Sequence, residues 1–293
     1  MSSKLRRNLV PYLFLIIPVI IYLVWVIGPM FYTFYLSLTD WDGLTQPTFI
    51  GLENYRKLFD DKVFYLSLFN NVKWLITFIT VPVVLGLGLA MALNETIPGA
   101  KFFKMSFYMP MVLALVVSGL IWGWMYHPRG GLINTVIEGI GLVEKGPGWL
   151  SNRDLVLWSI IIVAVWRQVG YVMVLFLAGL KSINPQLLEA ATVDGANGWQ
   201  RFWNVILPLL TPVTVIVLVI SVIDSLRAFD LVSVMTRGGP ANASSVLANF
   251  MYIEAFNNYK MGYGAAIAVV LFVLSMAFIF AYLRRVMKDE MEY

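Results

Sequence analysis

Few residues of this chain could take part in covalent chemistry or bind a metal ion. The 293-residue sequence contains one histidine, His127, and no cysteine. Disulfides, thiolate chemistry and metal centres built on several histidines are therefore excluded. The sequence also contains no G-x4-G-K-[ST] motif, so it lacks a Walker A loop for a nucleoside triphosphate. These absences argue against an enzyme and predict that the chain binds no metal ion or cofactor of its own.

The remaining candidates are charged residues within long apolar stretches, namely Arg167 in "VWRQVGY" and Asp224 in "VIDSLRAFD". A charged side chain is costly in lipid and therefore marks a candidate functional site. Each lies 13 residues from the predicted cytoplasmic end of its span, or about 20 Å at 1.5 Å per residue. The matching depth allows an ion pair, which would be either structural or part of a substrate site.

Polar and aromatic residues accompany this pair at helical spacing. Gln168 and Tyr171 follow Arg167, and four residues of the later stretch share one helical face. Hydroxyl, amide and aromatic groups together suit a sugar, whereas an arginine could also favour an anionic solute such as a glycerophosphate. The candidate substrate-binding residues are Arg167, Gln168, Tyr171, Ser221, Asp224, Ser225 and Ala228.

The elements that must position these residues are membrane spans. Hydrophobic residues make up 59% of the chain and charged residues 13%, against about 25% charged in soluble domains. The first apolar run is too long for a signal peptide and is predicted to be an uncleaved span. We predict an all-α integral membrane protein with one domain, residues 1–293, and six transmembrane helices of about 20 residues or more: 9–36, 70–92, 105–125, 155–180, 211–231 and 263–283.

The orientation of these spans follows from the positions of the cations. Six spans place both termini on one side, and basic residues such as Lys4, Arg6 and Arg7 cluster close to the span ends on that side. The positive-inside rule then predicts cytoplasmic termini and a cytoplasmic segment 181–210. The net charge of +4 is a topology signal in this arrangement, so no nucleic-acid partner is expected.

The cytoplasmic segment 181–210 contains the polar stretch "EAATVDGANGWQRFWNVILPLL". Asn184 is a predicted N-cap, Pro185 occupies the first helical position, and Gly195 permits a left-handed helix end. A second helix is predicted to begin near Gly198. A three-turn helix needs a packing partner, which is either the lipid surface or another protein.

This stretch resembles the EAA loop, E-A-A-x3-G-x9-I-x-L-P, of permease subunits in bacterial ATP-binding-cassette (ABC) importers. "LSLTDW", "IGLENY", "TRGGP" and "MGYGAA" extend the resemblance to the sugar-importing maltose and glycerol-3-phosphate type over nearly the whole chain. The ending departs slightly, since Ile206-Leu207-Pro208 lacks the residue between leucine and isoleucine.

The resemblance implies the type I importer permease fold, with a cytoplasmic coupling helix that fits a cleft of an ATPase. The implied coupling residues are Glu189, Ala190, Ala191, Asp194 and Gly195. The implied partners are a paralogous second permease, a homodimeric cytoplasmic ATPase that binds ATP and Mg²⁺, and an extracytoplasmic solute-binding protein, all at the bacterial inner membrane. The candidate residues listed above match positions that line the sugar site of maltose-type permeases, although Arg167 and Asp224 depart from that mostly neutral site. Alternating access would then carry a mono- or oligosaccharide or a related polyol across the membrane.

Two other classes remain open from the residues alone. A proton-coupled secondary transporter would use Asp224 as its proton carrier, but such proteins usually have more spans, often as inverted repeats. A membrane-bound enzyme would need a catalytic group facing water, and this sequence offers none. Uptake measured with ATP present and the proton gradient collapsed separates transport driven by ATP from transport driven by protons.

Overall fold

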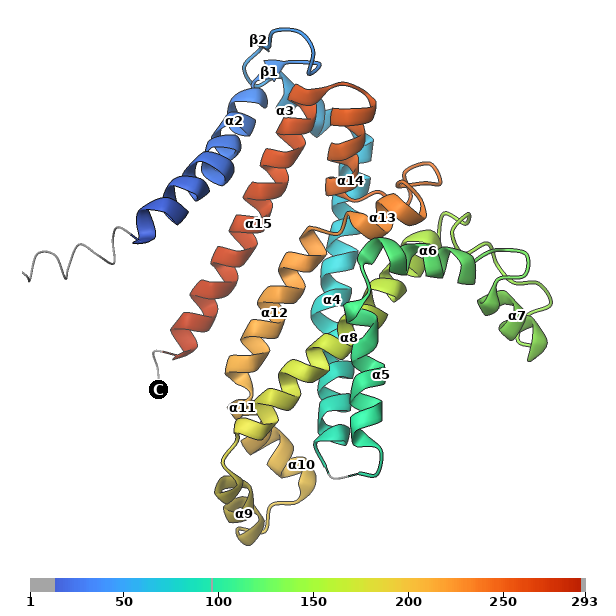
Figure 1. Cartoon of the computed structure of the whole chain (residues 1–293), viewed down its shortest axis with the longest axis vertical. Coiled ribbons are helices and arrows are strands. Elements are labelled where there is room, and N and C mark those ends of the chain that lie inside the picture. The colour runs from blue at the N-terminus through green and yellow to red at the C-terminus, as the bar shows by residue number, and fades with distance from the viewer. Residues whose placement is uncertain (1–13, 96, 291–293) are drawn as a thin grey trace, which may run out of the picture. The chain divides into compact units, whose positions relative to one another are not determined.

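The computed structural model describes residues 14–95 and 97–290, apart from the side chains at 281–283 and 285–290. The regular secondary structure of this part of the chain is helical except for one two-stranded sheet (Figure 1). Its residues divide into two compact units, 14–61 with Phe250–Val273 and Lys62–Asn249 with 274–290. The predicted N-terminal cations and the start of the first span lie outside the described residues.

Within the described residues, four helices are long and apolar enough to cross a membrane: Phe14–Leu36, Lys62–Asn94, Val156–Ser182 and Met261–Phe280. Two bent pairs raise the number to six if each pair forms one span. Ala100–Val112 and Leu115–Met125 are bent by 102°, and Gly198–Leu209 and Thr211–Met235 by 67°. The predicted all-helical membrane class is confirmed, and each predicted span corresponds to one of these elements.

The first unit joins two apolar helices to a small polar cap. Its elements are η1 (Leu23–Ile27), α2 (Gly28–Leu36), β1 (Thr39–Asp40), β2 (Thr48–Phe49), α3 (Glu53–Asp60), η3 (Ile253–Asn257) and the first part of α15 (Met261–Glu290). The strands are antiparallel, with Thr39 opposite Phe49. The buried Asn54 amide donates to the carbonyls of Ser37 and Thr39 at 3.0 and 2.8 Å, which fixes α3 against the end of α2.

The second unit is built around α8 (Val156–Ser182), which packs against both α4 (Lys62–Asn94) and α5 (Ala100–Val112). The α12 helix (Thr211–Leu226) packs against α4 and α8. Two apolar clusters lie along these helices, one around Trp74 and Ile160 and one around Met173 and Phe176. The remaining elements of this unit are α6 (Leu115–Met125), α7 (Leu132–Gly139), α9 (Pro185–Val193), α10 (Gly198–Arg201), η2 (Phe202–Ile206), α11 (Leu207–Leu209) and α13 (Asp230–Met235). The chain passes from this unit to the first within α14 (Leu247–Tyr252).

The predicted span 105–125 is not one straight helix. The α5 helix contains Pro110 and ends at Val112, after which Leu113 and Ala114 are extended and α6 begins at Leu115. Proline has no amide hydrogen and weakens the helix that contains it. The predicted span 211–231 also ends early, because α12 stops at Leu226 and Arg227 to Phe229 lead into α13.

Close helix contact in this unit depends on glycine. A side-chain carbon at Gly170 of α8 would collide with the carbonyl group of Phe107 in α5, and one at Gly86 of α4 would lie 2.6 Å from Val172. At Gly88 the same atom would meet nothing within 4 Å. Small residues allow backbones of membrane helices to approach closely, so α8 can lie directly against both neighbours.

Candidate functional site

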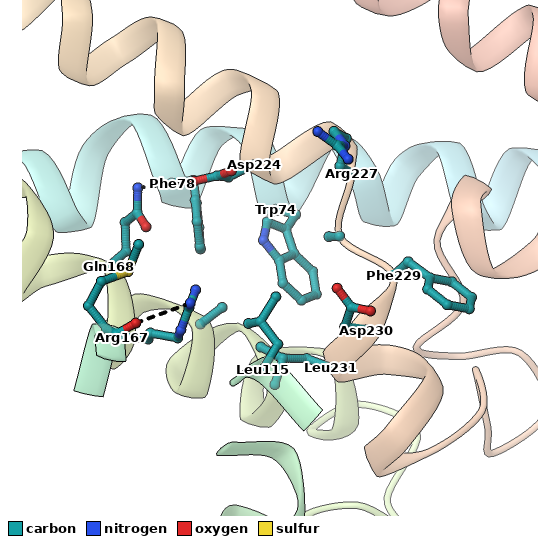
Figure 2. Close-up of a pocket in the computed structure, with 13 residues that line it drawn as sticks. Trp74, Phe78, Leu115, Arg167, Gln168, Asp224, Arg227, Phe229, Asp230 and Leu231 are labelled. Carbon is teal, nitrogen blue, oxygen red and sulfur yellow. Dashed lines mark hydrogen bonds between the residues drawn. The ribbon is translucent and has the colours of Figure 1, made fainter. Parts of the chain in front are cut away.

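A cavity of about 360 Å³ lies in the second unit beside α4, α8 and the end of α12 (Figure 2). Its volume is in the range of about 300–1,000 Å³ that is typical of small-molecule sites. The break between α5 and α6 and the segment between α12 and α13 complete its walls. The lining residues are Trp74, Phe78, Met111, Leu115, Ala164, Arg167, Gln168, Asp224, Arg227, Ala228, Phe229, Asp230 and Leu231.

Four of the seven predicted substrate residues line this cavity, namely Arg167, Gln168, Asp224 and Ala228. The other three, Tyr171, Ser221 and Ser225, do not. The Ser225 hydroxyl donates to the Val222 carbonyl at 2.8 Å within its own helix. The two serines are completely buried. Of the residues predicted to share one helical face, only Asp224 and Ala228 therefore reach the cavity.

The predicted ion pair between Arg167 and Asp224 is not formed. The Arg167 Nε and Nη2 atoms instead donate to the carbonyl oxygens of Leu113 and Met111, each at 3.3 Å. Asp224 Oδ2 accepts a hydrogen bond from Gln168 Nε2 at 3.4 Å. Backbone carbonyls at a helix C-terminus have no partner within the helix and carry partial negative charge. Arg167 thus caps the end of α5 and stabilises the break in the third span.

The charges around the cavity balance. Arg167 and Arg227 contribute two cations, and Asp224 and Asp230 contribute two carboxylates. Figure 2 shows Arg167, Gln168 and Asp224 on one side of Trp74, with Arg227 and Asp230 on the other. A cavity with donors and acceptors on both sides and no excess charge suits a neutral, hydroxyl-rich ligand better than an anion.

Three aromatic residues line the cavity, Trp74, Phe78 and Phe229, and the sequence reasoning identified none of them. Trp74 and Phe78 lie one turn apart on α4, with ring centroids 6.1 Å from each other and planes tilted by 43°. Both are buried, and both line the cavity. The sequence does place an aromatic pair at i and i+4 on one helical face, but this spacing is equally typical of an apolar core.

A polar ladder on α4 holds this face in position. Asn70 Nδ2 donates to the carbonyls of Ala243 and Ser245 at 2.9 and 2.8 Å, and Asn71 Oδ1 accepts from the amide of Leu247 at 2.8 Å. Ser67 Oγ donates to Ser245 Oγ at 3.1 Å. These polar residues lie on the same face of α4 as Trp74, three, four and seven residues before it, so the ladder fixes the rotation of α4 and the direction of Trp74.

The predicted coupling segment forms a helical hairpin. Asn184 caps α9 by accepting from the Gln186 amide, and Pro185 occupies the first helical position. Gly195 has a φ of +83°. Its amide donates to Thr192 at 3.1 Å, and the Ala196 amide donates to Ala191 at 3.0 Å, which is the hydrogen-bond pattern of a Schellman motif.

The second helix of the hairpin starts where the sequence predicts. Asn197 and Gln200 form a reciprocal capping box in front of α10. Arg201 Nη1 reaches back to donate to Thr192 Oγ1 of α9 at 2.9 Å. Glu189, Ala190, Asp194 and Gly195 are exposed and Ala191 is half-buried, so most of the predicted coupling residues are accessible on the described chain.

Comparison with known proteins gives one family. The family model described as "Binding-protein-dependent transport system inner membrane component" matches residues 7–289. A trehalose/maltose transport system permease protein of Thermococcus litoralis is 33% identical over 97% of this chain and 96% of its own length. A probable starch degradation products transport system permease protein of Thermoanaerobacterium thermosulfurigenes is 34% identical over 93% of this chain and 92% of its own.

The fold also has a solved counterpart. A chain of a bacterial ABC transporter involved in the import of the acidic polysaccharide alginate superposes with a TM-score of 0.84. The alignment covers 98% of both chains at 21% identity, and at this identity the likeness concerns the fold alone.

Proposed function

Because the chain belongs to the family of binding-protein-dependent transport system inner membrane components, and its relatives are permeases of ABC transporters, we propose that it forms part of the import pathway for a neutral carbohydrate. The observation that carries this proposal is the charge-balanced cavity, which is lined by two arginines, two aspartates and the buried rings of Trp74 and Phe78. Sugars present both hydroxyl donors and acceptors and apolar ring faces, and this lining matches both.

The anionic alternative is less well supported. A glycerophosphate would need an excess of cations, and the planar guanidinium fork is well suited to a phosphate. Here both forked donors of Arg167 are already directed at backbone carbonyls, and two carboxylates face the same cavity. An anion entering this cavity would meet two carboxylates, and only one of the two arginines, Arg227, has a guanidinium group that is not directed at backbone carbonyls of the described chain.

The hairpin supplies a mechanical link between ATP hydrolysis and the cavity. The α9 helix follows directly from α8, and η2 and α11 lead into α12. Both α8 and α12 carry residues of the cavity lining. We propose that an ATPase receives Glu189, Ala190, Ala191, Asp194 and Gly195 in a cleft, and that its closure tilts α8 and α12 together to switch the side from which the cavity is open.

The proposed assembly contains further chains. ATP and Mg²⁺ would bind to a homodimeric cytoplasmic ATPase, whose two clefts require two hairpins, so a paralogous second permease completes the pathway. A solute-binding protein delivers the sugar from outside, and both termini of this permease face the cytoplasm. Purification of a transport-competent complex from this chain and the ATPase alone would contradict the need for the second permease.

The test of function is uptake into proteoliposomes that contain the whole complex, with ATP inside and the binding protein outside. The radiolabelled panel is maltose, trehalose, xylose, arabinose and glycerol 3-phosphate. We expect one or more of the sugars to accumulate in an ATP-dependent manner that persists when the proton gradient is collapsed. Uptake of glycerol 3-phosphate alone would favour the anionic alternative, and loss of uptake with the gradient would favour a proton-coupled transporter.

A further inference from the structure

Trp74 carries an indole N–H that no residue of the described chain accepts. The side chain is only 2% exposed, and its Nε1 atom is buried without a hydrogen-bond partner. A buried polar group without a partner costs roughly as much as the hydrogen bond that it fails to make. A phenylalanine would fill most of this space without that cost, so packing among the described residues does not explain the indole N–H.

The direction of the indole identifies where its partner would be. Trp74 lines the cavity, and Figure 2 shows its nitrogen on the edge of the ring that faces Phe78 and Arg167. The polar ladder described above holds α4 in a fixed rotation through Asn70 and Asn71. Because these contacts fix the rotation of α4, the fold holds the indole N–H toward the cavity.

The hydrogen-bonding groups around Trp74 indicate what it would bind. Gln168 Nε2 is engaged with Asp224, and Arg167 is engaged with the α5 carbonyls. The indole is a donor only, so its partner must be an acceptor, and a hydroxyl oxygen of a sugar is one. Such an oxygen can accept from Trp74 while its own hydrogen is donated to one of the carboxylates of the lining.

We propose that Trp74 determines sugar specificity by donating its indole N–H to one hydroxyl oxygen of the transported carbohydrate. This inference rests on the proposed function and adds a contact on α4 that the sequence did not predict. A site that hydrogen-bonds a particular hydroxyl discriminates against an analogue that lacks it, because the buried donor is then left unpaired. The consequence is measurable as a preference among deoxy sugars.

The experiment uses the complete complex in proteoliposomes and the panel sugar with the highest uptake. For each variant, the uptake of this sugar is divided by that of each of its monodeoxy analogues, so that effects of the binding protein cancel between variants. The wild type should discriminate against one analogue in particular. In Trp74→Phe that ratio should fall by about two- to tenfold, which corresponds to one neutral hydrogen bond, while the other ratios stay unchanged.

Trp122→Phe is the matched control. Trp122 also has a buried Nε1 without a partner in the described chain, and it packs beside the same apolar cluster, but it does not line the cavity. All deoxy ratios should therefore remain at their wild-type values in this variant. An equal change in both variants would assign the effect to packing and overturn the inference.

A second variant covers the case in which Trp74→Phe does not fold. Replacing Trp74 with 3-benzothienylalanine keeps the size and shape of the indole and exchanges only its N–H for sulfur. The same single ratio should fall. If the wild type imports a sugar and neither Trp74 variant changes any uptake ratio, Trp74 does not hydrogen-bond a hydroxyl group of the substrate. If the wild type imports none of the panel sugars, the proposed function itself fails, and this inference falls with it.

Discussion

Replacing Arg167 should destabilise the protein by removing the cap at the end of α5. In Arg167→Met the carbonyls of Met111 and Leu113 lose two charge-assisted hydrogen bonds of 3.3 Å. Hydrogen bonds to charged groups contribute about 1.5–3 kcal/mol each, and these are at the long end of the distance range. We therefore expect the free energy of unfolding to fall by about 3 kcal/mol. The measurement is the fraction of monodisperse protein that survives heating in nanodiscs, which should be lower than in the wild type.

A conservative variant and a neighbouring carboxylate sharpen this test. Arg167→Lys should recover about half of the loss, because a single ammonium group lacks the fork that reaches both carbonyls. Asp224→Asn should cost little, since its observed partner is the Gln168 amide at 3.4 Å. In the double variant with Arg167→Met the two effects should add to within about 1 kcal/mol, because the hydrogen bonds of Arg167 and Asp224 go to other partners.

The opposite result would restore the ion pair that the sequence predicted. In a buried pair, removal of one partner costs about 3–5 kcal/mol and removal of both is much milder, because the penalty arises from the charge left alone. If Asp224→Asn alone were as damaging as Arg167→Met, and the double variant recovered most of the stability, the capping role of Arg167 would be refuted.

Three further predictions concern the hairpin, the helix contacts and the turn at Asp42. Gly195→Val should keep the complex assembled but reduce substrate-stimulated ATP hydrolysis, because a β-branched residue is strained at a φ of +83°. Asparagine tolerates this conformation better, so Gly195→Asn should retain more of the stimulation. Equal stimulation in both variants would refute the argument. Gly170→Ala should lower the yield of folded protein, since its new methyl group would meet the Phe107 carbonyl, whereas Gly88→Ala has open space and should not; equal yields would remove the close-packing argument. Hydrogen bonds from the amides of Thr45 and Leu44 lower the pKa of Asp42 from 3.8 to about 2. The ionised carboxylate therefore stabilises this turn above about pH 3.8, and the contribution is lost as the pH falls toward 2. A carboxyl resonance of Asp42 that titrates near pH 3.8 would contradict this prediction.

The sequence predicted the helices and the hairpin well because their signals are local. Asn184, Pro185 and Gly195 each act within a few residues of their own position, and the structure places all three in their predicted roles. The apolar runs likewise predict spans through length and composition alone. These features do not depend on which other helix lies nearby.

The cavity was predicted only in part because its geometry depends on contacts between distant segments. The depth of Arg167 and Asp224 was computed for straight helices, but the break after Pro110 releases carbonyls that compete for the arginine. Ser221 and Ser225 share the helical face of Asp224, yet α12 packs that part of the face against its neighbours. Trp74 was not recognised because its neighbours come from α8 and from the segment after α12, and no short-range pattern reveals them.

The hairpin of α9 and α10 is closed by its own hydrogen bonds: the Asn184 cap, the Schellman motif at Gly195 and the capping box of Asn197 and Gln200. Ordering a residue costs roughly 1–2 kcal/mol of conformational entropy. Since this hairpin is already ordered within the folded chain, an ATPase that binds it would not have to supply that entropy again. More of the contact energy would then remain as affinity. The hairpin would be a preorganised surface that an ATPase binds and releases in every transport cycle without refolding.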